Sequence, residues 1–135
     1  MKAKIIALSL MLTAGSVFAA DVAAPPTNAE RAVCAGAAAA AKFKVYGGSG
    51  TPVDTATAFF VKTGFDVQCS SNTFVSFAEN SATLFTVAAG SAKGNQSVKG
   101  SSNGGAVTVH AKCTGTNDAC GTGDITTALT AAASL

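Results

Sequence analysis

Four cysteines behind an export signal constrain this chain more than any other feature of its sequence. Lys2 and Lys4 precede an apolar run from Ile5 to Leu12, and the small-residue end Val17-Phe18-Ala19 is typical of a signal peptidase site. The apolar run is too short to cross a bilayer as a helix. We therefore expect residues 1–19 to be a cleaved signal peptide.

The mature chain is then residues 20–135, and we expect it to be secreted to the cell surface or the extracellular space, with the periplasm as the alternative. Its cysteines are Cys34, Cys69, Cys113 and Cys120. Thiols outside the cytoplasm tend to oxidise to disulfides, and four cysteines allow three pairings. We favour Cys34–Cys69 as a long staple and Cys113–Cys120 as a clamp on one loop. The alternative joins Cys69 to Cys113, which both end predicted strands.

Composition and charge narrow the class of partner. Removing Lys2 and Lys4 from the nine basic residues leaves seven, against seven acidic residues, so the mature chain is neutral. A neutral chain has no electrostatic attraction to nucleic acid or to an anionic membrane surface. No later stretch is apolar for long enough to span a bilayer. Its length suits a single domain, and we expect neither nucleic-acid binding nor membrane attachment after signal cleavage.

Short apolar segments, separated by turn-forming residues about every ten positions, dominate the chain from Gly47 onward. Residues 65–69 and 107–111 alternate apolar and polar side chains, as half-buried strands do. Further apolar runs lie at 58–61, 73–77 and 84–87. This pattern predicts a mainly β protein with a small antiparallel β-sandwich, whereas Gly90 to Gly105 is predicted to be a long exposed hairpin or loop.

The N-terminal part of the mature chain has a different pattern. Residues 20–32 contain Pro25-Pro26 and are predicted to form an extended arm. Thr27-Asn28-Ala29-Glu30 matches a capping box, and Ala29 to Ala41 has the highest helix propensity in the chain. We therefore predict one short Ala-rich helix there. The alternative is a first strand that ends at Phe43-Lys44-Val45-Tyr46.

The C-terminal segment is predicted to be a strand with one apolar face. Residues of one parity supply that face: Ile125, Leu129, Ala131, Ala133 and Leu135. Such a strand either closes its own domain or is added to the sheet of a second subunit. These five residues are therefore our candidate subunit contacts.

Two motifs resemble reactive sites. His110-x-x-Cys113 with Cys120 could bind zinc, but oxidation outside the cytoplasm removes the thiolates that zinc requires. Gly100-Ser101-Ser102-Asn103-Gly104 fits the G-x-S-x-G pattern, yet it lies in a loop-like context and lacks the order of serine, acid and histidine. We expect no enzyme activity, no metal and no cofactor.

One stretch resembles a known family. Cys34 is followed, after a gap of 35 residues, by Cys69 within Thr63-Gly64-Phe65-Asp66-Val67-Gln68-Cys69-Ser70-Ser71. This is similar to the first part of chaperone–usher pilins, over about a third of the chain. The resemblance implies an immunoglobulin-like sandwich, self-association into a fimbrial polymer and a periplasmic chaperone as partner.

Together these features predict a structural subunit of a bacterial extracellular filament or other surface assembly. A soluble secreted or periplasmic binding or inhibitor module is the alternative. The chain has no tryptophan and only one tyrosine, so it is poorly supplied with aromatic rings for stacking on sugars. That composition favours the structural role.

Overall fold

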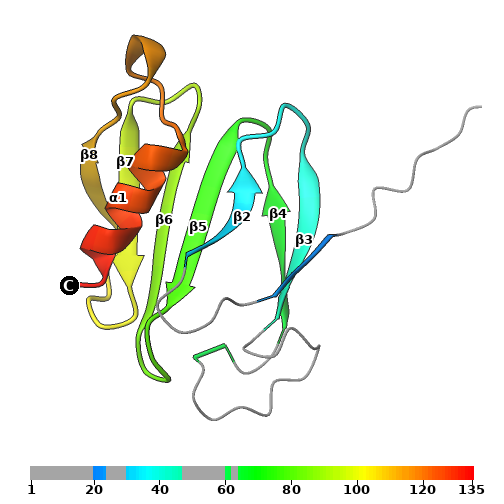
Figure 1. Ribbon diagram of the computed structural model, residues 1–135, viewed down its shortest axis with the longest axis vertical. Helices are drawn as coiled ribbons and strands as arrows, with labels where there is room; N and C mark the ends of the chain where they lie inside the picture. The colour runs from blue at the N-terminus through cyan, green and yellow to red at the C-terminus, as the bar shows by residue number, and fades with distance from the viewer. Residues whose placement is uncertain (1–19, 24–29, 47–59, 62–63) are drawn as a thin grey trace, which may run out of the picture.

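A computed structural model describes residues 20–23, 30–46, 60–61 and 64–135, and shows two β-sheets and one α-helix (Figure 1). The predicted signal peptide and the Thr27 capping box lie outside the described residues. The elements in chain order are β1 Ala20–Ala23, β2 Arg31–Ala35, β3 Ala41–Tyr46, β4 Phe65–Cys69, β5 Thr73–Glu79, β6 Phe85–Ser91, β7 Gln96–Ser101, β8 Thr108–Lys112, a 3-10 turn at Thr116–Asp118 and α1 Thr122–Ala132.

The larger sheet has the strand order β2-β5-β6-β7-β8, and all its neighbouring strands are antiparallel. The smaller sheet has the order β1-β3-β4, in which β1 is parallel to β3 and β4 is antiparallel to it. The predicted mainly β, antiparallel architecture is therefore confirmed. The strands expected around residues 65–69, 73–77, 84–87 and 107–111 are present as β4, β5, β6 and β8.

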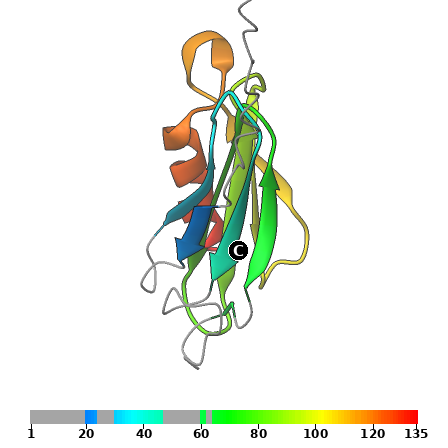
Figure 2. The same ribbon diagram turned by 90° about the vertical axis from the view of Figure 1, so that its right-hand side faces the viewer.

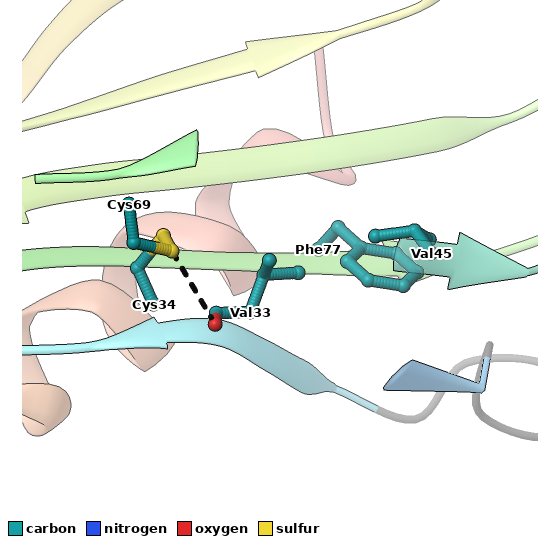
Figure 3. Close-up of a cluster of buried hydrophobic side chains, with 5 residues drawn as sticks. All are labelled: Val33, Cys34, Val45, Cys69 and Phe77. Atoms are coloured by element: carbon teal, nitrogen blue, oxygen red, sulfur yellow. Dashed lines mark hydrogen bonds between the residues drawn. A yellow bond between two sulfur atoms is a disulfide. The ribbon is translucent and has the colours of Figure 1, made fainter. Parts of the chain in front are cut away.

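The main apolar core lies between the two sheets. Its buried members come from both layers (Figure 3): Val33, Cys34, Val45, Cys69 and Phe77. The Phe77 ring also stacks on Phe85, with 5.4 Å between the ring centroids. Because side chains of β2 and β5 meet those of β3 and β4, the two sheets pack as layers of a sandwich-like fold.

A second core joins the helix to the other face of the larger sheet. Its members on α1 are Ile125, Ala128 and Leu129, which pack against Ala78 and Ala88 of β5 and β6. In Figure 1 the helix lies across this sheet, and Figure 2 shows it on one side of the strands. The larger sheet is thus covered by the helix on one face and partly by the smaller sheet on the other.

The predicted C-terminal strand is wrong, because this segment is the helix α1. Ile125, Ala128, Leu129 and Ala132 are its buried residues, and their spacing of three and four is that of one helix face. Of the other expected strand residues, Ala131 is half-buried, whereas Ala133 and Leu135 are exposed. Threonine hydroxyls on the outer face donate to the carbonyl four residues earlier, which satisfies them within the helix.

The predicted N-terminal helix is also wrong. Arg31–Ala35 is instead β2, paired with β5, and Ala41–Tyr46 is β3, so the alternative of an early strand ending at Tyr46 is closer to the structure. Gly36 has a φ of +72° and ends β2 in a conformation that favours glycine. Helix propensity is a weak preference, and pairing with β5 overrides it here.

Two smaller expectations need correction. The stretch Gly90 to Gly105, predicted to be a long exposed hairpin or loop, does contain the turn between β6 and β7, but β7 Gln96–Ser101 is an inner strand of the larger sheet, paired with both β6 and β8. The predicted arm contains β1, which adds to the edge of β3. Sequence periodicity missed β7 because its apolar content is only Val98 among serine, glycine and lysine.

The structure confirms the favoured disulfide pairing. Cys34 is bonded to Cys69, which links β2 of one sheet to β4 of the other, and Cys113 is bonded to Cys120 across the loop before α1. Two disulfides are typical of proteins that fold outside the reducing cytoplasm. Among the described residues, no helix has the length and apolar character needed to cross a bilayer.

Candidate functional site: the β8 edge of the larger sheet

Strand β8 ends the larger sheet. It is antiparallel to β7, and its opposite edge has no strand partner within the described part of the chain. An edge strand of this kind presents backbone N–H and C=O groups that can pair with another strand. Natural proteins usually restrict such edges, so an accessible one is a candidate contact surface.

Valine side chains make one face of this edge apolar. Val98 of β7 lies opposite Ala89 of β6 on one side and opposite Val109 of β8 on the other. The side chains of Ala89, Val98 and Val109 therefore share one face of the sheet. Val109 is 57% exposed and Val107 is 66% exposed. In Figure 1 the smaller sheet lies at the β2 end of the molecule, far from β8. We call Val98, Val107 and Val109 the valine face.

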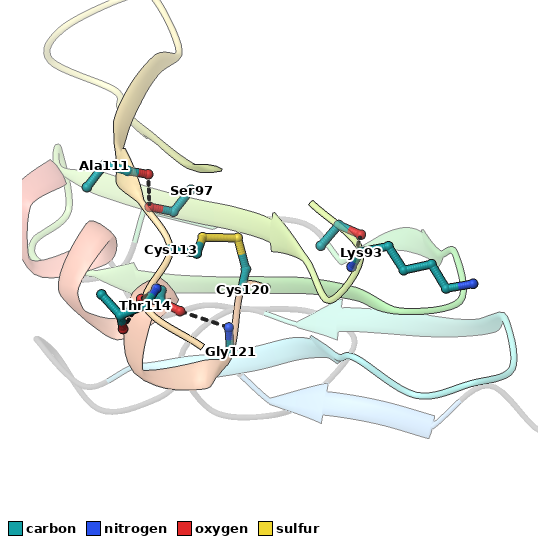
Figure 4. The surroundings of a disulfide bond; sticks show 9 residues. Lys93, Ser97, Ala111, Cys113, Thr114, Cys120 and Gly121 are labelled. Carbon is teal, nitrogen blue, oxygen red and sulfur yellow. Dashed lines mark hydrogen bonds between the residues drawn. A yellow bond between two sulfur atoms is a disulfide. The ribbon is translucent and has the colours of Figure 1, made fainter. Parts of the chain in front are cut away.

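The Cys113–Cys120 bridge holds the end of β8 in place (Figure 4). The backbone N–H of Cys113 donates to the Asn95 carbonyl at 2.9 Å, and that of Cys120 donates to the Ser91 and Gly94 carbonyls. Lys112 forms an exposed ion pair with Asp118 at 2.7 Å. The loop of residues 113–120 is therefore hydrogen-bonded to the β6–β7 turn, and these contacts fix the position of the end of β8.

Asp124 fastens the same loop to the start of α1. Its carboxylate accepts hydrogen bonds from the Gly121 backbone N–H at 2.9 Å and from the backbone N–H and hydroxyl of Thr114 at 3.0 and 2.9 Å. The Gly121 hydrogen bond, followed by those from Thr114, stabilises the charged form and lowers the pKa of Asp124, although partial burial opposes this. Both carboxylate oxygens therefore hold the loop to the start of α1.

The opposite face of β8 is polar. His110 and Lys112 border a hollow of about 350 Å³ together with Ser97 of β7 and Thr127 of α1. The Ser97 hydroxyl donates to the Ala111 carbonyl at 3.4 Å. Near the C-terminal end of α1, Lys99 Nζ of β7 donates a hydrogen bond to the Ala131 carbonyl at 3.1 Å and so links the helix to the sheet. A cation at the C-terminal end of a helix is favourable.

The residues of the zinc-like motif and of the G-x-S-x-G motif make disulfide and turn contacts in the structure. The sulfurs of Cys113 and Cys120 are bonded to each other, so the thiolates that a zinc site with His110 would need are absent, and the described residues contain no group of three or more metal-ligating side chains. The Ser102 hydroxyl accepts from the Phe85 N–H and donates to the Thr83 carbonyl, both at 3.0 Å. Ser102 is therefore a turn hydroxyl.

The five candidate subunit contacts do not share one exposed face, because they belong to α1 and the residues after it rather than to a strand. Ile125 and Leu129 lie on the side of α1 that packs against the larger sheet, where they are buried and are not accessible to a partner. The valine face was not singled out from the sequence, although the alternation of Val107, Val109 and Ala111 was visible there. Alternation predicts a strand with two faces, but it does not indicate whether that strand lies at an edge.

Comparisons of this chain with protein-family models, with curated proteins and with solved structures find no match in any of the three.

Proposed function

We propose that the mature chain is a secreted structural subunit that associates with copies of itself in an extracellular filament or surface assembly, as pilins do. The β8 edge with its exposed valine face is the observation that carries this proposal. The export signal in the sequence and the two disulfides support an extracytoplasmic location.

The geometry favours a head-to-tail contact between copies. The larger sheet has five antiparallel strands, so its outer strands β2 and β8 run in the same direction, and each has five residues. Repeating the molecule along the sheet, with a rotation that continues the twist of its strands, would place β2 of one copy beside β8 of the next, in parallel. Contacts between two different surfaces generate open polymers, whereas pairing β8 with itself would close a dimer.

The same arrangement of copies would also cover the valine face. The smaller sheet packs on the face of the larger sheet that is opposite α1, at the β2 end. The valine face lies on that same side at the β8 end. The smaller sheet of the next copy would therefore lie near Val107 and Val109.

The proposal includes an immunoglobulin-like arrangement of the two sheets and a periplasmic chaperone that protects the subunit before assembly. The Cys34–Cys69 bridge, which joins an early strand to the end of a later one, supports the first part. The β8 edge, which no other described strand covers, supports the second, because an exposed edge risks premature association.

Assembly of the oxidised mature protein tests this function. Wild-type protein should form species larger than a monomer in size-exclusion chromatography, and filaments in negative-stain electron microscopy. Val109→Lys should reduce assembly strongly, since a lysine on the valine face resists edge pairing. Thr126→Lys, a matched change on the exposed side of α1, should assemble like the wild type. A wild-type monomer at all concentrations, or unchanged assembly of Val109→Lys, would contradict the proposal.

A further inference from the structure

An apolar cavity of about 180 Å³ lies between the two sheets. The smaller sheet contributes Val45, Phe65 and Val67 to its wall, and the larger sheet contributes valine and phenylalanine side chains that include Val75 and Phe85. Every described residue of the lining is a valine or a phenylalanine. Figure 3 shows Val45 beside Phe77, another residue of the lining.

A cavity of this size is not ordinary packing space. Protein interiors are close-packed, and voids larger than a water molecule are few. Water is poorly held without two to four polar partners, and an apolar cavity of about 150 Å³ in another protein stays dry and binds benzene or xenon. The cavity between the sheets has a comparable volume and offers no polar side chain from the described residues. It is therefore suited to an apolar guest.

The wall of this cavity is also accessible from outside. Phe65 lines the cavity and is nevertheless 42% exposed. Phe60, which is 37% exposed, stacks on Phe85 of the wall with 5.4 Å between the ring centroids. One wall of the cavity therefore lies next to the surface, and we expect a guest to enter past these rings.

We propose that this cavity binds one small uncharged apolar molecule, of the size of a single aromatic ring or a short branched alkyl group. A charged or strongly hydrogen-bonding ligand is disfavoured because the lining would leave its polar groups unpaired. A long acyl chain exceeds the volume. This binding site is separate from the β8 edge, so it does not depend on the proposed assembly.

Benzene is the probe for the test. Adding it to the oxidised mature protein should raise the Tm in a saturable way, because a ligand that binds only the folded state stabilises it. It should also shift the methyl resonances of Val45 and Val75 in NMR spectra, two lining residues that remain in the variants below. Val67→Phe should abolish both effects by filling the cavity, whereas Val109→Phe, the same change on the exposed valine face, should leave both intact.

Val67→Leu provides a milder filling variant if Val67→Phe does not fold, and it should weaken the apparent affinity for benzene several-fold. Absence of a saturable Tm shift in the wild type would overturn the proposal. So would an undiminished response in a folded Val67 variant, or a response lost in Val109→Phe. Performing the titration on monomeric Val109→Lys keeps the result independent of assembly, since benzene should bind that variant as it binds the wild type.

Discussion

The two disulfides should stabilise the protein to different extents, because they close loops of very different length. Cys34–Cys69 spans 35 residues and Cys113–Cys120 spans 7. In the chain-entropy model, closing these loops in the unfolded state stabilises the fold by about 3.8 and about 2.4 kcal/mol. The model therefore predicts that the longer loop stabilises the fold by about 1.4 kcal/mol more than the shorter one. We test this difference rather than either value, because the loss of buried contacts on removing a disulfide is similar for the two bridges and largely cancels.

That cancellation follows from the burial of the four cysteines, which are between 3% and 5% exposed. Replacing either pair with alanine therefore removes a similar amount of buried apolar surface. The measurement is urea unfolding of Cys34→Ala/Cys69→Ala and Cys113→Ala/Cys120→Ala without reductant. The first variant should have the lower free energy of unfolding, by about 1–2 kcal/mol.

The comparison is valid if the two variants have similar m values, because a changed m value indicates a different change in exposed surface. Equal stabilities, or a less stable Cys113→Ala/Cys120→Ala variant, would refute the loop-length argument. The second outcome would show that the native-state docking of residues 113–120 on the β6–β7 turn outweighs the entropy of the unfolded chain.

Three substitutions test the packing around α1 and the end of β2, with the free energy of unfolding as the measurement in each case. Ile125→Ala should reduce it by about 2–5 kcal/mol, because Ile125 is fully buried between α1 and the sheet; a loss below 1 kcal/mol would contradict this packing. Gly36→Ala should reduce it by about 1–3 kcal/mol, because φ is +72° and the added Cβ would lie 2.3 Å from Phe74 Cζ. Gly123→Ala should instead raise it by up to about 1 kcal/mol, because this helical position has open space for a Cβ; a decrease would show a constraint there.

Sequence reasoning succeeded where a local pattern and the final environment agree. Alternation at residues 65–69 and 107–111 predicts strands, and β4 and β8 are present there, although in β8 the apolar Val109 is exposed rather than buried. The disulfide pairing was also predictable, because Cys113 and Cys120 bracket a turn. The strands and the Cys113–Cys120 bridge are specified by residues close together in the chain, and with four cysteines that bridge leaves only Cys34 and Cys69 to pair.

The prediction from sequence is wrong for the C-terminal segment, where the same residues fit both the two-residue period of a strand and the 3.6-residue period of a helix. Ile125 and Leu129 are compatible with both a strand face and a helix face, and Ala128 and Ala132, which distinguish the two, are small enough to be overlooked. The Ala-rich segment shows the reverse error, because a helix is predicted where the structure has a strand. Its composition favours a helix, but Arg31–Ala35 pairs with β5 as a strand. Partners distant in sequence decide both cases, and a single sequence does not display them.

The valine face was hidden for the same reason. A strand's own residues do not reveal whether a neighbouring sheet covers it, and here the smaller sheet extends over the β2 end only. The inter-sheet cavity likewise depends on how valine and phenylalanine side chains from five strands meet. Features of this kind require the assembled fold, whereas strand positions and disulfides do not.

The Asp124 carboxylate should make the stability of the protein depend on pH in acid. Hydrogen bonds from Gly121 and Thr114 lower its pKa in the folded state, so the folded protein binds this proton less readily than the unfolded chain does. The resulting stabilisation is fully present above the ordinary aspartate pKa of about 3.9 and is lost as the pH falls through the lowered value. Asp124→Asn removes the titrating group but keeps a side chain of similar shape.

The free energy of unfolding should therefore be lower for Asp124→Asn than for the wild type at pH 6, and the two values should converge as the pH approaches 2. Thr114→Val, which removes one of the three donors, should lie between them at pH 6. Urea unfolding at several pH values measures these differences directly. A difference between wild type and Asp124→Asn that stays constant from pH 6 to pH 2 would show that ionisation of Asp124 does not stabilise the fold. The hydrogen bonds at the start of α1 would then act through geometry alone.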